Sequence, residues 1–110
     1  MNNITIKQLQ ECILEIDHTP DAIDQYFQKL VEEVGELSRA MRKDIRLDDN
    51  DGIKGTVEEE LYDVLYYVIC LANMYHIDLE KCAILKEELN KEKYHRPSIF
   101  EKSKSITLKK

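Results

Sequence analysis

Nine consecutive apolar residues, from Val64 to Ala72, constrain the fold of this 110-residue chain more than any other feature. They follow Thr56 and Glu59, whose spacing is that of a capping box at a helix N-terminus. A helix over about residues 56–75 would be apolar on every side, which is typical of a helix enclosed by other elements. Because the run is far shorter than the roughly 20 residues that span a bilayer, we expect it in a folded core and not in a membrane.

Helical periodicity marks three further segments, and no segment has the alternation typical of a strand. These segments cover about residues 5–17, 19–41 and 78–94. The second is expected to begin with Thr19 as N-cap and Pro20 in the first turn, while Asp78 is expected to cap the last. The sequence therefore predicts an all-α chain, a four-helix antiparallel bundle built on a helical hairpin.

Three other short helices of the same chain can bury only part of the apolar surface of the helix over residues 56–75. We therefore predict that homodimerisation completes the bundle, with a dimer of dimers as the alternative assembly. The composition, with 43% apolar residues, 35% charged residues, three glycines and two prolines, agrees with a helical domain.

Charge divides the chain into an acidic body and a basic end. The net charge is -6, yet residues 95–110 hold five lysines and arginines against one glutamate. The acidic body argues against nucleic-acid binding. We expect a helical domain over residues 1–96 and a basic tail over 97–110, which either binds a polyanion or only solubilises the chain.

The three cysteines are odd in number and form no CxxC motif, which argues against a disulfide framework and a zinc knuckle. We expect reduced and mostly buried thiols. The N-terminus lacks the apolar segment of a signal peptide. Both features favour a cytoplasmic location.

Carboxylates form two groups on the helices expected to build the hairpin. Glu60 and Asp63 are three residues apart and share a helix face, while Glu33 flanks the apolar stripe of the helix over 19–41 and Glu36 follows one turn later. In an antiparallel hairpin centred near residue 48, Glu33 is level with Asp63, and Glu36 with Glu60. The four carboxylates are therefore expected to converge.

Two interpretations of these acids stay open. Acids in a first turn favour the helix dipole, so a solvated acidic face explains Glu58 and Glu59, but it does not explain Asp63, which lies two turns inside the helix. Converging carboxylates repel one another strongly in a partly dry site unless a proton or a cation intervenes. An all-oxygen ligand set favours Mg²⁺ or Mn²⁺. A metal site is the favoured interpretation.

Gly35 lies among these acids, although alanine would stabilise a helix by about 1 kcal/mol more. We expect the glycine to leave room for a neighbouring backbone or for a nucleotide. Simple tolerance of glycine is the alternative.

Glu-Glu-Val-Gly-Glu at residues 32–36 and Glu-Leu-Tyr-Asp at 60–63 resemble the EExxE…ExxD signature of the MazG-like nucleoside triphosphate pyrophosphohydrolases, in the all-α NTP pyrophosphatase superfamily. The resemblance covers about residues 20–96. It implies Mg²⁺-dependent hydrolysis of (deoxy)nucleoside triphosphates to a monophosphate and pyrophosphate, in nucleotide-pool housekeeping. It also implies the metal ligands, which are Glu33, Glu36, Glu60 and Asp63.

Further residues follow from the same resemblance. Glu32 matches the first glutamate of the signature, which implies that it orients the attacking water. The family often contacts phosphates through an Asn and basic residues of the last helix, and the loosely matching residues here are Asn90, Lys91, Lys93 and Arg96. Within the superfamily, dUTP/dCTP diphosphatase and phosphoribosyl-ATP pyrophosphohydrolase are alternatives. A non-catalytic acidic dimer that docks a basic partner is the alternative outside it.

Overall fold

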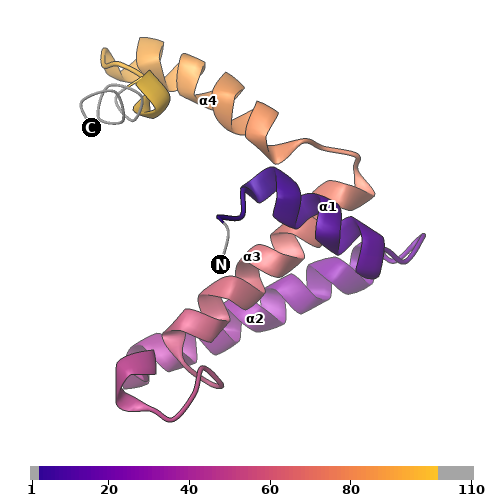
Figure 1. Cartoon of the computed structure of the whole chain (residues 1–110), viewed down its shortest axis with the longest axis vertical. Coiled ribbons are helices and arrows are strands. Elements are labelled where there is room, and N and C mark those ends of the chain that lie inside the picture. Colours follow the sequence, from indigo (N-terminus) through magenta and orange to yellow (C-terminus); the bar gives the residue numbers. More distant parts are fainter. Residues whose placement is uncertain (1–2, 102–110) are drawn as a thin grey trace. The chain divides into compact units, whose positions relative to one another are not determined.

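A computed structural model describes residues 3–101, and this part of the chain is all-helical (Figure 1). The all-α class predicted from the sequence is confirmed, while the four-helix bundle and its completion by a second subunit stay predictions. The elements are α1 (Ile6–Ile16), α2 (Ile23–Lys43), the short 3-10 helix η1 (Leu47–Asp49), α3 (Val57–Met74) and α4 (Leu79–Tyr94). The chain divides between His76 and Ile77 into two compact units, of which the first contains α1, α2 and α3 and the second contains α4.

The first unit is built on the predicted antiparallel hairpin, in which α2 and α3 lie side by side (Figure 1). Residues at the two ends of the connecting loop are bonded to each other. The Val57 N–H donates to the Ile45 carbonyl at 2.8 Å, and the Arg46 guanidinium pairs with Glu58 at 3.0 Å. These contacts hold the end of α2 beside the start of α3.

Thr56 caps α3 as the sequence predicts, but the reciprocal bond of the predicted capping box is not formed, because Glu59 Oε1 accepts from the Gly55 N–H and the Thr56 N–H donates to the Ile53 carbonyl. The Thr56 hydroxyl accepts a hydrogen bond from the Glu59 N–H at 3.1 Å and donates to the Ile53 carbonyl at 2.5 Å. The side chain is fully buried. Because both bonds of the hydroxyl fix the first turn of α3, they also fix the position from which Glu60 and Asp63 project.

The start of α2 differs from the prediction. Thr19 is not its N-cap, because α2 begins at Ile23 after Ala22. Asp21 adopts a left-handed backbone conformation with φ of 64°, which a right-handed helix does not allow. The Thr19 N–H instead donates to the Tyr26 hydroxyl at 3.0 Å, so residues 19–22 form a turn that leads into the helix.

Helix α1 packs on α3 through a buried amide pair. Gln10 Nε2 donates to Asn73 Oδ1 at 3.1 Å, and Asn73 Nδ2 donates to the Gln10 carbonyl at 3.2 Å. At the end of α1, Asp17 accepts hydrogen bonds from the hydroxyls of Tyr26 and Tyr66. All three helices of the first unit are thereby joined through polar contacts as well as through apolar packing.

Within the first unit, helix α3 is not enclosed on every side. Ile69 and Cys70 are buried, but Leu61 is 53% exposed and Val68 is 36% exposed. The prediction that a second subunit covers this helix stays a prediction. The expectation of mostly buried thiols is wrong for Cys12 and Cys82, which are exposed, while all three cysteines are free.

In the second unit, Asp78 caps α4 as predicted, accepting a hydrogen bond from the Lys81 N–H at 3.2 Å. The helix ends at Tyr94, and its C-cap, His95, has the left-handed conformation common at helix C-termini. Residues 102–110 of the predicted basic tail lie outside the described residues. Between residues 3 and 101, no helix combines the length and apolar character that a membrane span requires.

Candidate metal centre

Three carboxylates meet between the two helices of the hairpin. Glu33 of α2 and Glu60 and Asp63 of α3 each offer an oxygen, and the three oxygens lie within 4.8 Å of one another. The register of the hairpin explains the grouping, since Glu33 lies level with Asp63 when the helices run antiparallel. In the described part of the chain, neither a histidine nor a cysteine joins this group.

Glu60 is the buried member of the group, with only 7% of its surface exposed. Its Oε2 is buried and has no hydrogen-bond partner among residues 3–101. Burial raises the pKa of Glu60 to about 7, and a hydrogen bond with Glu33 and the nearby negative charges add to the effect. Burial and the charge of Glu33 also raise the pKa of Asp63.

The chemistry of these residues fits a hard divalent cation. Carboxylate oxygens are the ligands that Mg²⁺ and Mn²⁺ prefer. A buried carboxylate oxygen without a partner is costly, and a cation bound to it would remove that cost. The group is therefore able to hold a metal ion.

The other two glutamates of the first motif lie outside this group. Glu36 is exposed, yet it lines a pocket of about 230 Å³ together with Glu60. Glu32 forms an exposed ion pair with Lys29, at 3.3 Å between Lys29 Nζ and Glu32 Oε2.

Gly35 faces open space. A Cβ atom added there would meet no atom within 4 Å. No neighbouring backbone of the described chain therefore explains the glycine.

Comparison with known proteins shows the family of the chain. The family model of the MazG nucleotide pyrophosphohydrolase domain matches residues 21–100. The chain belongs to the MazG nucleotide pyrophosphohydrolase family. No curated protein matches it.

Solved structures of a MazG-family protein, iMazG from Vibrio DAT 722, resemble the chain in sequence and in fold. One crystal structure has 50% sequence identity and a TM-score of 0.73, and covers 84% of this chain and 100% of that one. A second has 50% identity and a TM-score of 0.71, and covers 80% of this chain and 99% of that one.

The pocket beside the MazG carboxylates also brings in residues that the sequence analysis missed. Arg39 and Lys43 of α2 line it with Glu36 and Glu60, and Gly55 borders it from the loop. Gly55 has φ of 79°, a conformation that glycine adopts without strain. The signal in the sequence was the spacing of Arg39 and Lys43, which follow Glu36 by three and seven residues on one helix face.

The predicted phosphate-binding residues of this MazG domain lie in the second unit, where they contact nearby side chains. Asn90 Nδ2 and Arg96 Nη1 both donate to Glu87, at 3.0 and 3.1 Å. These hydrogen bonds help to lower the pKa of Glu87. The amide of Ile99 donates to the same carboxylate at 3.2 Å, so Glu87 ties residues 96–99 to α4.

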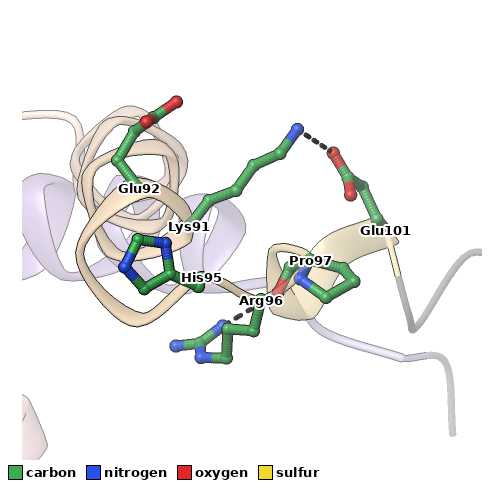
Figure 2. A pocket seen from close by; sticks show the side chains of 6 residues that line it. All are labelled: Lys91, Glu92, His95, Arg96, Pro97 and Glu101. Atoms are coloured by element: carbon green, nitrogen blue, oxygen red, sulfur yellow. Dashed lines mark hydrogen bonds and ion pairs between the residues drawn. The ribbon is translucent and has the colours of Figure 1, made fainter.

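Lys91 and Lys93 have partners as well. Lys91 pairs with Glu101 at 3.2 Å beside a pocket of about 350 Å³ (Figure 2). Lys93 Nζ lies 5.3 Å from the centre of the Tyr94 ring. Each predicted phosphate ligand thus has a local contact within the second unit.

Proposed function

We propose that this MazG-family protein hydrolyses (deoxy)nucleoside triphosphates between the α- and β-phosphates, releasing a monophosphate and pyrophosphate. The observation that carries the proposal is the convergence of Glu33, Glu60 and Asp63 around a buried, unpartnered oxygen of Glu60. Membership of a nucleotide pyrophosphohydrolase family supports the same reaction. Nucleotide-pool housekeeping is the proposed role.

Glu33, Glu60 and Asp63 are the proposed ligands of Mg²⁺, or of Mn²⁺ in its place. Glu36 is proposed as a fourth ligand, since its exposed side chain is free to turn toward Glu60 across the pocket that both line. A bound divalent cation would lower the pKa of a water molecule and offset the charge of the phosphates.

Glu32 is proposed to orient the attacking water. Its ion pair with Lys29 is exposed on both sides, and such solvent-screened pairs contribute little to stability. The pair is therefore weak enough to exchange for a water contact.

Substrate phosphates are proposed to bind Asn90, Lys91, Lys93 and Arg96. Arginine binds a phosphate through two parallel hydrogen bonds, while lysine acts as a point charge. Arg96 and Lys91 now pair with carboxylates in ion pairs that are partly exposed. A phosphate is able to replace these partners at modest cost.

The reaction is tested with a panel of nucleotides that includes dUTP, dCTP and phosphoribosyl-ATP, assayed for pyrophosphate and orthophosphate separately. We expect release of pyrophosphate from at least one nucleotide in the presence of Mg²⁺, and none after addition of EDTA. Release of orthophosphate alone, or no release across the panel, would favour a non-catalytic acidic dimer that docks a basic partner. The preferred nucleotide would distinguish a general housekeeping enzyme from the two specialised pyrophosphohydrolases.

We also propose that two copies of the chain associate, as the apolar run of α3 predicts, and that the apolar stripe of α2, which is defined by Phe27, Val31, Val34 and Met41, forms part of the interface. These residues recur at spacings of four, three and seven, so they share one helix face. Each is about half exposed or more. A second copy with the same stripe is the occupant whose chemistry fits, and the assembly is proposed to be a dimer or a tetramer.

Wild-type protein is expected to have at least twice the monomer mass by light scattering at micromolar concentration. Val31→Glu should weaken association by about tenfold or more, because an unpaired carboxylate in an apolar interface is costly. Since Val31 is 55% exposed, the change should leave the fold of the single chain intact. Gln28→Glu, on an exposed position of the same helix, is the control. A monomeric wild type, or equal association of both variants, would contradict the proposed interface.

A further inference from the structure

The pocket beside Glu60 has carboxylates at one end and basic side chains at the other. Glu36, Arg39 and Lys43 are on one face of α2, and Glu60 enters from α3. The helix rise places Lys43 about 10 Å beyond Glu36 along the axis of α2. Ala40, which is buried and small, lies between them, so the side chains of this face border an open space of about 230 Å³.

Arg39 and Lys43 differ from the other basic residues discussed above. In the part of the chain that the structure describes, neither side chain makes a hydrogen bond or an ion pair, whereas Arg46, Lys91 and Arg96 all pair with carboxylates. Lys43 lies in the last turn of α2, where a cation is favoured by the helix dipole. Arg39 lies one turn earlier, where the helix dipole stabilises a cation much less. The dipole therefore does not explain why a cation lines the pocket at this position.

Charge indicates what this basic end accommodates. The carboxylate end already gathers Glu33, Glu60 and Asp63, and a triphosphate would add several negative charges to it. A cation held by these carboxylates offsets only part of that charge. An anion extending along α2 from the carboxylates would meet a guanidinium and then an ammonium group, both of which bind phosphate oxygens.

We propose that Arg39 and Lys43 bind the terminal phosphates of the substrate, the half that leaves as pyrophosphate. The proposal rests on the proposed hydrolysis, and it adds the orientation in which the triphosphate binds. The triphosphate lies along α2 with its terminal phosphates toward the loop between α2 and α3, and its nucleoside extends the opposite way. The ligand class of the basic end is inorganic or nucleotide-borne pyrophosphate.

The test is calorimetric titration of inorganic pyrophosphate into the full-length protein in Mg²⁺ buffer, which needs no catalytic turnover. Arg39→Gln and Lys43→Gln should each weaken binding by about tenfold or more, as expected for loss of a charge-assisted hydrogen bond. Arg42→Gln is the matched control, because Arg42 lies on the same helix and bonds to Ser38 at 2.9 Å outside the pocket. It should bind pyrophosphate within about twofold of wild type.

Thermal unfolding with and without Mg²⁺ distinguishes loss of the phosphate contact from loss of the fold. Arg39→Gln should retain the Mg²⁺-induced rise in Tm of wild type, because the carboxylates are unchanged. In turnover assays, it should raise the inhibition constant of pyrophosphate and leave that of the nucleoside monophosphate unchanged.

The outcomes separate this inference from the proposed hydrolysis. A wild type that binds no pyrophosphate, or an Arg39→Gln variant that binds it as tightly as Arg42→Gln does, would overturn the inference even if nucleotides are hydrolysed. Loss of pyrophosphate binding in Arg39→Gln supports the pocket assignment, even if no nucleotide of the panel is hydrolysed.

Discussion

Glu60→Gln is expected to lower nucleotide hydrolysis by at least about 100-fold. Even residues that only support metal ligands cost about 10–100-fold when they are replaced, and Glu60 is proposed as a ligand itself. No described residue hydrogen-bonds its buried Oε2, so the substitution removes the negative charge that a cation would meet there. Initial rates of pyrophosphate release at saturating nucleotide and Mg²⁺ measure the loss.

Glu59→Gln is the matched control for this substitution. Glu59 lies in the same first turn of α3, and its Oε1 accepts a hydrogen bond from the Gly55 N–H at 2.7 Å, which the amide oxygen of glutamine can also accept. The control removes the same charge outside the carboxylate group and should retain most of the activity. If Glu60→Gln and Glu59→Gln are equally active, the metal-site proposal is wrong.

Magnesium is expected to stabilise the wild-type fold and to stabilise Glu60→Gln much less. A ligand that binds only the folded state adds about 2.7 kcal/mol to the free energy of unfolding at roughly a hundredfold excess over its Kd. Replacing Glu60 removes the most buried of the converging carboxylates. Calorimetric unfolding over a Mg²⁺ series, starting in EDTA, measures this difference.

Without metal, Glu60→Gln should be more stable than wild type, which is the reverse of the order expected in Mg²⁺. In EDTA, the fold of Glu60→Gln should be more stable than that of wild type by about 1–3 kcal/mol, the cost of an unsatisfied buried polar group. Above the pKa of Glu60, which is about 7, the wild-type carboxylate repels Glu33 and Asp63, whereas a glutamine amide donates to a carboxylate at any pH. Glu36→Gln should change the metal-free Tm less, since Glu36 is exposed. Equal Mg²⁺ shifts in wild type and Glu60→Gln would show that magnesium acts elsewhere.

Much of the hairpin could be predicted from the sequence, because its signals are local. The Thr56 cap and the apolar run after it depend on residues within a few positions of one another, and the structure has both. The spacing of the carboxylates also predicts which residues lie level in an antiparallel pair. Glu33, Glu60 and Asp63 meet as this register requires.

Local signals failed where a partner outside the local motif decides the backbone. Thr19 and Pro20 have the sequence of a helix start, yet the hydroxyl of Tyr26 binds the Thr19 N–H and α2 begins four residues later. The apolar run of α3 likewise does not show which of its faces its own chain covers. Ile69 is buried and Val68, the next residue, is partly exposed, because α1 and α2 cover only part of the helix circumference.

The sequence by itself determined the helical class, the hairpin register and the acidic residues of the candidate centre, since periodicity, capping and spacing act over a few residues along one helix. Only the tertiary structure decided which oxygen is buried without a partner and which cations share its pocket. Glu36 occupies a metal-ligand position of the EExxE…ExxD signature, yet its side chain is exposed. Arg39 and Lys43 line the pocket although neither belongs to that signature. Burial and pairing depend on atoms from both helices at once, and a pattern along one helix does not contain that information.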